Sequence, residues 1–304
     1  LGDASIGGGN GGKGGETNLA GIHIASGKAD GKIGEIKIYT ASSSADGGKG
    51  GTGENCISGF GGAGGAIYAA GISNNGGEAE LTVDKITIYT KGGDGGALQD
   101  VKITDLSSIN AAGKIQAAAG KGGEALAVGV DNRGGNSNIT VNEDISVQAR
   151  GGNGGSGANV TFGDNITAID SSVDQILRSE MACGAGGEAI AVGLQNTDGS
   201  LTANVKKLSV TATGGRSGTG CKGSIMGAGD SNFGGAAAAY GINVLGGLAE
   251  SLTASEIEVT ATGGSSYYAG DANFGGNQGA TGGNGGQGAN GAAYGVSNSG
   301  GSVG

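Results

Sequence analysis

The sequence of 304 residues contains no proline and no tryptophan, and only 4 % of it is aromatic. Charged residues are also scarce, at 14 %, and the acidic ones outnumber the basic ones, which gives a formal net charge of −10. Without proline or a chain-long G-x-y period, a collagen helix is excluded. The negative charge disfavours nucleic acid and anionic membranes as partners. No apolar run approaches the roughly 18 residues that a membrane span needs, so we expect no membrane insertion.

The residues that common active sites require are almost missing. His23 is the only histidine, and the chain has three cysteines, no Cys-x-x-Cys and no H-E-x-x-H. We therefore predict no enzyme, no catalytic residue, no metal site and no cofactor. The run Gly92–Gly96 resembles the start of a calcium-binding nonapeptide but lacks aspartate at the required position and is not followed by tandem copies, so only incidental calcium binding stays open. An odd number of cysteines leaves open whether Cys183 and Cys221 form a bridge or all thiols are simply buried.

Glycine, by contrast, accounts for 75 residues. Because glycine loses more backbone freedom on folding than any other residue, such a chain needs repetitive close packing or extensive backbone hydrogen bonding. A short phrase of the type A-x-G-I indeed recurs six times, at irregular intervals that indicate a fixed core with variable inserts. The glycines that anchor it are Gly21, Gly71, Gly129, Gly193, Gly241 and Gly295.

The first five of these anchors are followed by apolar residues at every second position and then, in most repeats, by a Gly-Gly pair. After Gly129, for example, come Ile139, Val141, Ile145 and Val147. This alternation of β-branched residues predicts strands. The fold class is therefore all-β, a single domain over residues 1–304 built as a parallel β-solenoid of about six coils. We take about 27 residues, from the A-x-A-x-G strand to the Gly-Gly exit, as one coil.

Between these units lie glycine-rich inserts with glycine at every third position, unbroken from Gly276 to Gly291. A left-handed extended helix has three residues per turn, so one of its edges would be lined by glycine and could approach a neighbouring backbone. The A-x-A-x-G strands are apolar on both faces and should be covered on both. We therefore predict polyglycine II inserts packed on each other and outside the solenoid, although flexible linkers are the alternative. Residues 101–116 and 160–181, with fewer glycines, are expected to form loops.

The phrases AYGI at 239–242 and VTATGG at 259–264 resemble repeats of large secreted bacterial β-helix proteins, including autotransporter passengers and filamentous adhesins. The resemblance implies an extracellular or cell-surface location and a role in adhesion or surface structure. The three-residue glycine period separately resembles the polyglycine II bundles of phage tail-fibre adhesins and of a snow flea antifreeze protein.

The two ends of the chain suggest self-assembly. Joined head to tail, they would separate Gly295 from Gly21 by the length of one predicted coil without an insert. Uncapped solenoid ends expose strand edges, so we predict a fibre subunit that stacks on copies of itself. A window cut from a longer solenoid would show the same match. The interface predicted for this contact consists of Leu1, Ala4, Ile6, Ala293, Tyr294, Val296 and Val303.

Two other functions stay open at this point. In the first, the chain is an adhesin that binds glycans or cell surfaces through insert loops, with Tyr267 and Tyr268 as ligand contacts. In the second, it binds ice, because Thr211 and Thr213 in one unit and Thr260 and Thr262 in the next resemble a threonine array.

Overall fold

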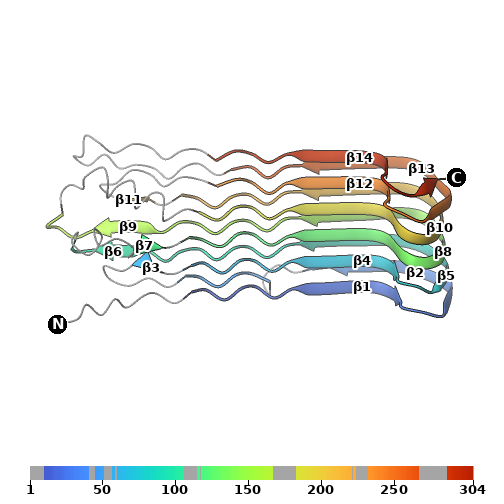
Figure 1. The fold of residues 1–304 in the computed structure, drawn as a ribbon, viewed down its shortest axis with the longest axis horizontal. Coiled ribbons are helices and arrows are strands. Elements are labelled where there is room, and N and C mark those ends of the chain that lie inside the picture. Colours follow the sequence, from blue (N-terminus) through green and yellow to red (C-terminus); the bar gives the residue numbers. More distant parts are fainter. Residues whose placement is uncertain are drawn as a thin grey trace.

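The computed structural model describes residues 10–40, 45–50, 57–58, 60–105, 115–116, 118–166, 183–220, 222–223, 232–266 and 286–303. In this part of the chain all regular structure is β-strand, and every strand pairing is parallel. The molecule is elongated, with long strands at one end and wavy extended segments between them and the other end (Figure 1). The predicted all-β class and a large parallel sheet are thus confirmed.

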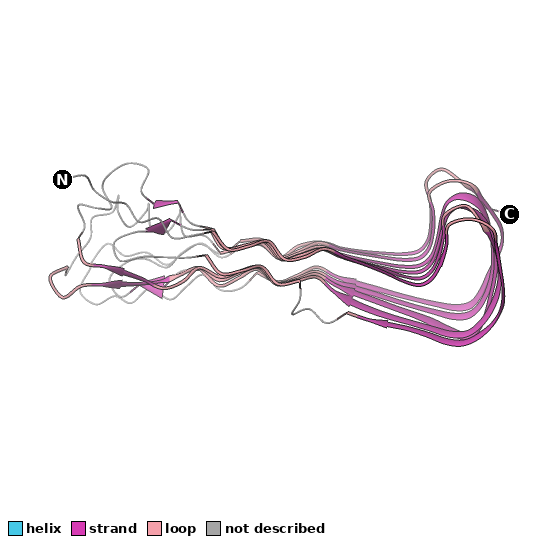
Figure 2. Cartoon of the chain, turned by 90° about the horizontal axis from the view of Figure 1, so that it is seen from below, coloured by secondary structure: helices cyan, strands magenta, loops and turns pink. Residues whose placement is uncertain are grey.

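The long strands form two layers that are joined by a bend, which gives a U shape (Figure 2). We call the length of chain between one strand and the next equivalent strand a circuit. We call the strands that contain the glycine anchors the first layer. In sheet order it contains β1 (Thr17–Ile24), β4 (Ile67–Asn74), the start of β8 (Ala125–Arg150), the start of β10 (Ala189–Thr213), β12 (Ala237–Val244) and β14 (Gly291–Asn298).

The second layer follows the bend in each circuit. It contains β2 (Lys28–Tyr39), β5 (Glu78–Lys91), the later parts of β8 and β10, β13 (Leu248–Thr262) and the two-residue β15 (Ser302–Val303). Because β8 and β10 run through the bend without a break, the two layers belong to one continuous ten-stranded sheet.

The core lies between the two layers. Alternate residues of the second layer, such as Ile139, Val141 and Ile145, point inward and are buried. They pack against small inward residues of the first layer, such as Ala125 and Ala127. Equivalent positions of successive strands are partners, so similar residues form rows across the sheet. The backbone groups of neighbouring strands hydrogen-bond, and the side chains within a row pack on each other.

The circuit is longer than the sequence suggested. Thr17 pairs with Ile67 and Ala125 pairs with Ala189, so the chain returns to an equivalent position after the full spacing between anchors. The prediction of a short coil that ends at the Gly-Gly exit is therefore wrong. The glycine-rich segments are themselves hydrogen-bonded parts of the circuit and are not additions to it.

These glycine-rich segments continue the strands lengthwise, as two layers in the middle of the molecule (Figures 1 and 2). Gly95 N donates to Asn153 O (2.8 Å) within one layer, whereas Gly96 N donates to Gly62 O (2.8 Å) in the other layer. The segments therefore pack on each other, as predicted. The expectation that they lie outside, over the strands, is wrong for the described segments, because their backbone groups find partners in the neighbouring circuits.

Short strands lie at the end of the molecule away from the bend. They are β3 (Ile57–Ser58), β6 (Val101–Ile103), β7 (Ile115–Gln116), β9 (Asn159–Phe162) and β11 (Lys222–Gly223). β9 pairs with both β6 and β11. The parts of 101–116 and 160–181 that were expected to be loops thus contain paired strand residues, because the stack continues beyond the glycine segments.

Candidate functional site: the ends of the strand stack

The described part of the predicted interface lies at one end of the stack. Ala293, Tyr294 and Val296 are in β14, the last strand of the first layer, and Val303 is in β15 beside it. All four are exposed. Leu1, Ala4 and Ile6 lie outside the described residues.

Burial along the strand rows shows why this end is open. Tyr294 is 46 % exposed, whereas Val192, two strands away in the same row, is 1 % exposed. Val296 is 57 % exposed, whereas Leu194 in its row is 0 % exposed. The Val296 position is buried in every interior strand, and Tyr240, which β14 covers, is less exposed than Tyr294, so another circuit on β14 would reduce the exposure of the same apolar surface.

The opposite end of the stack is formed by β1. Leu19 and Ala20 are exposed there, while their partners Ala69 and Ala70 in β4 are fully buried. The sequence-based prediction missed Leu19 and Ala20 because it placed this end at the very start of the chain. The anchor phrase Leu19–Ile22 was the available signal, since it is the first member of the repeated strand.

The two ends are complementary in size along one outward row. Tyr294 stacks on Tyr240, with ring centroids 5.1 Å apart and planes 11° from parallel. At the other end of this row stands the small Ala20. If a second copy placed its β1 on β14, the small Ala20 of that copy would lie next to Tyr294 and leave room for the tyrosine ring.

The stretch from Gly295 through the chain ends to Gly21, which was predicted to form one coil in a head-to-tail joint, is too short for an observed circuit. Each observed circuit instead takes the full distance between successive anchors, as from Gly71 to Gly129, and that distance includes a glycine-rich segment. Support for end-to-end contact therefore comes from the strand edges and their exposed apolar rows.

The outer face of the first layer carries a buried carboxylate, Asp131. It accepts hydrogen bonds from Tyr68 Oη (2.5 Å), Arg133 Nε (2.6 Å) and Gln195 Nε2 (3.1 Å). The Arg133 guanidinium also lies 5.0 Å from the centre of the Tyr68 ring. Burial, and then the hydrogen bond to Asp131, raises the pKa of the Tyr68 hydroxyl. These side chains therefore bond one another and cover part of the outward apolar face.

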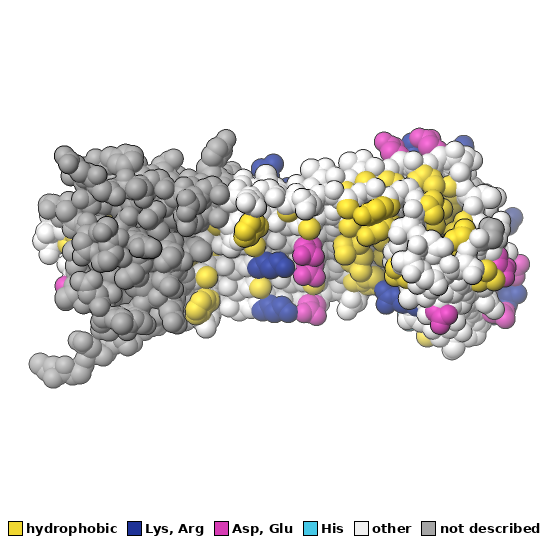
Figure 3. Space-filling view, turned by 45° about the horizontal axis from the view of Figure 1, so that its top comes forward, with side chains coloured by type: hydrophobic (Ala, Val, Ile, Leu, Met, Phe, Trp, Pro, Cys, Tyr) yellow, Lys and Arg dark blue, Asp and Glu magenta, His cyan; other side chains and the backbone are white. Residues whose placement is uncertain are grey.

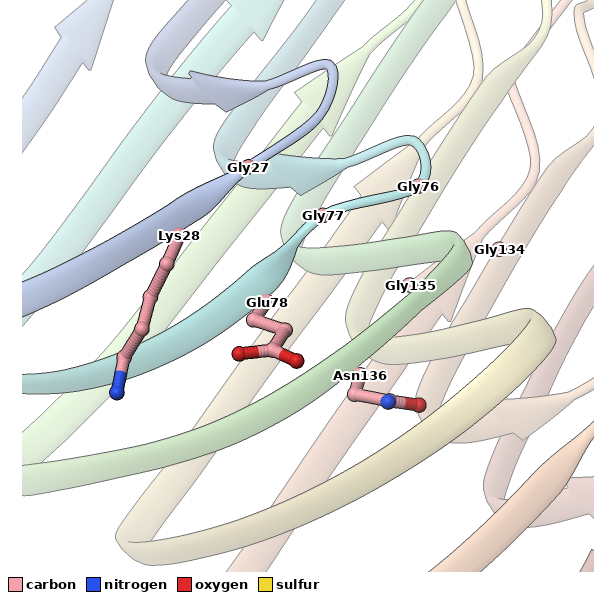
Figure 4. A pocket seen from close by; sticks show the side chains of 8 residues that line it. All are labelled: Gly27, Lys28, Gly76, Gly77, Glu78, Gly134, Gly135 and Asn136. Carbon is pink, nitrogen blue, oxygen red and sulfur yellow. The ribbon is translucent and has the colours of Figure 1, made fainter.

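Figure 3 shows one face of the molecule, on which hydrophobic side chains gather toward the strand-rich end. A hollow of about 240 Å³ is lined by Tyr68, Leu126 and Ile190 with the acidic Glu124 and Glu188. Another hollow, of about 480 Å³, lies beside the bends, where Lys28, Glu78 and Asn136 of successive strands project on the same side (Figure 4). Neither hollow combines groups with an evident catalytic arrangement.

The remaining sequence candidates have diverse outcomes. His23 is exposed in β1, and Cys183 is buried, with its Sγ accepting a hydrogen bond from Asn232 N (3.1 Å). Thr211 and Thr213 pair with Thr260 and Thr262. The Thr211 row continues with Gln148 and the tyrosines of β5 and β2, and the Thr213 row continues with Arg150 and Lys91. The threonine array is thus limited to two strands of the described sheet. Tyr267, Tyr268 and Cys221 lie outside the described residues.

No group of three or more potential metal ligands occurs among the residues that the structure describes. The same residues include no helix that is long and apolar enough to cross a membrane. Comparisons with known proteins give no relative, since no protein-family model, curated protein or solved structure matches this chain.

Proposed function

We propose that this chain is a structural subunit of an extracellular fibre, without catalytic activity. In this proposal it is a β-solenoid of six coils, with polyglycine II segments forming the middle of each coil, and copies stack end to end. The exposed apolar residues of β14 carry the proposal, because the residues at the Ala293 and Val296 positions are buried in every interior strand and Tyr240, which β14 covers, is partly buried.

The geometry of the ends supports a repeating contact. Among the described strands, β14 pairs only with β12 and β1 only with β4, so each has one unpaired edge. Neighbouring strands of the first layer are parallel and pair equivalent residues without a register shift, so a second copy can add its β1 to β14 by the same pairing. A contact between two different surfaces propagates and does not close, which is the requirement for a filament. The extracellular location rests on the resemblance to secreted β-helix proteins.

The experiment is negative-stain electron microscopy of the purified chain in neutral buffer over a range of protein concentrations. We expect filaments that lengthen with concentration and whose thickness matches the long dimension of one subunit. Discrete short particles at every concentration would contradict end-to-end assembly and direct the search to glycan binding by the insert loops.

Two variants address the two ends separately. Val296→Asp places a charge on the exposed row of β14, and Gly12→Ala adds a methyl group at the other end, where nothing lies within 4 Å in the monomer. Both should weaken filament formation while leaving the monomer folded. Phe233→Asp is the matched control, because Phe233 is 58 % exposed but lies in an interior circuit. Filaments formed equally by all variants would disprove the proposed interface.

A further inference from the structure

At the β14 end of the stack, most of β13 in the second layer has an unpaired edge among the described residues. β14 ends the first layer, but in the second layer β15 covers only Leu248 and Ala249 of β13. From Glu250 to Thr262, the described residues pair β13 on one side only, with β10. A copy that added its β1 to β14 would therefore leave one strand position of the second layer unfilled.

The inward side of this open edge is apolar. Leu252, Ile257 and Val259 of β13 are only partly buried, whereas their partners in β10 are almost fully buried. The exposed inward residues of β14 face the same space from the first layer. An added strand would thus be covered on its apolar side by β14 and would pair along β13.

The outward side of the open edge carries an unbalanced negative charge. One row across the second layer alternates in sign, from Glu35 through Lys85, Asp144 and Lys207 to Glu256. Lys207 Nζ lies 2.8 Å from Glu256 and 3.4 Å from Glu258, so a single ammonium serves two exposed carboxylates. The alternation favours a cation at the next position of the row, because opposite charges on adjacent strands attract and like charges repel.

We propose that the open edge of β13 is an acceptor for one extended polypeptide strand that pairs parallel to it, with apolar residues at alternate positions and a lysine or arginine opposite Glu256. Main-chain hydrogen bonds would supply affinity, and the inward pockets and the Glu256 row would supply specificity. The site lies at the same end as the proposed fibre contact and rests on that function for its role, as the strand would complete the joint between copies.

The test uses the full 304-residue chain and a fluorescein-labelled peptide with the sequence of residues 202–213, TANVKKLSVTAT. This sequence is the native neighbour of Ser251–Thr262 and stops short of the positions that β15 occupies. We expect saturable 1:1 binding in fluorescence anisotropy, at peptide concentrations where sedimentation shows the free peptide to be monomeric. Absence of saturable binding would overturn the proposal.

Charge and register controls follow from the same geometry. Replacing both lysines of the peptide by glutamate, or Glu256 and Glu258 of the protein by glutamine, should weaken binding about tenfold, with a smaller difference at high salt. The peptide with aspartate in place of its central leucine and valine should not bind. The matched protein variant Glu80→Gln, on an interior strand, should bind like the unmodified chain. Equal binding of all peptides would overturn the assignment to this edge.

The outcome is separable from that of the fibre test. Peptide binding by a chain that forms no filaments would retain the strand acceptor and remove self-assembly. Filaments without peptide binding would retain self-assembly and remove the strand acceptor. If Tyr294→Asp, which changes a β14 residue outside the rows of the core between the layers, abolishes filaments and still binds the peptide, the two contacts are distinct.

Discussion

At the scale of single residues, glycine is required by the distance between neighbouring backbones. An added Cβ at Gly96 would overlap the carbonyl oxygen of Gly48, and the same overlap with a backbone oxygen recurs through the interior glycine segments. At Gly12, on the end of the stack, an added Cβ meets nothing within 4 Å. The requirement therefore comes from the adjacent circuit and not from the local conformation of the segment.

Gly96→Ala should therefore destabilise the fold, whereas Gly12→Ala should not. Forcing a methyl group into a packed site costs roughly 1–3 kcal/mol or more. The substitution would also disturb the hydrogen bonds that Gly96 makes to Gly62 O and accepts from Gly120 N. Thermal unfolding followed by circular dichroism, at a concentration where the chain is monomeric, measures the difference. Equal melting temperatures for the two variants would contradict the close approach of the layers.

The half-buried Tyr68 should make a pH-dependent contribution to stability. Its pKa is raised by burial and by the hydrogen bond to Asp131. The folded chain thus retains the phenolic proton at a pH where the unfolded chain, with a tyrosine pKa of about 10, loses it. The associated stabilisation is fully present below about pH 10 and decreases as the pH rises above that value.

Tyr68→Phe should lower the free energy of unfolding at pH 7 by about 1–3 kcal/mol, since it removes a hydrogen bond to a buried charge. Above pH 10 the gap between the two proteins should narrow. Urea unfolding at pH 7 and pH 11 checks this, and the comparison cancels the lysine titrations that both proteins share. A constant gap at both pH values would show that the Tyr68 hydroxyl does not hold its proton in this way.

At the scale of elements, the bend that joins the two layers depends on buried asparagines. Asn74, Asn132 and Asn196 share one row. Asn132 Nδ2 donates to Gly135 O (3.1 Å) across its own bend and to Asn196 Oδ1 (2.7 Å) in the next circuit. The bends at Asn74 and Asn132 are therefore each closed by a side chain that also bonds the next circuit, whereas Ile24 and Val244 occupy this row in β1 and β12.

Asn132→Ala should destabilise the chain by about 1–3 kcal/mol, because it leaves buried backbone carbonyls without their donor. Asn142→Ala is the matched control, since Asn142 is exposed and bonds only the exposed Asp84 among the described contacts. Chemical denaturation of both variants provides the measurement. A loss for Asn142→Ala as large as that for Asn132→Ala would indicate that the bend does not depend on the asparagine row.

At the scale of the whole molecule, each circuit contacts chiefly the circuits above and below it. Stability in such a stack is a sum of unit and nearest-neighbour terms, so the circuits at the ends have fewer stabilising contacts. The glycine layers and the strand layers share the same neighbours, and their backbone hydrogen bonds run continuously from one to the other.

Hydrogen exchange should therefore depend on position in the stack. We expect slow exchange for amides of β8 and β10 and for the glycines beside them, and fast exchange for β1 and β14. Filament formation should slow exchange at β1 and β14 and leave the central strands unchanged. Uniform protection along the stack, or slowing confined to residues away from the two ends, would contradict this description of the assembly.

The amino-acid sequence alone was enough to predict the strands, because alternating apolar residues and the A-x-G anchors report directly on a paired, half-buried backbone. It also indicated the three-residue period of the glycine segments, whose role as a layer follows from the absence of side chains. That these segments lie within the circuit became clear only from the folded chain, since a period does not reveal which backbone a glycine faces. The Asp131 cluster and the charge row from Glu35 to Glu256 likewise emerged only from the structure. Their members come from different circuits, far apart in the sequence, and a shift of one residue in strand register would separate them.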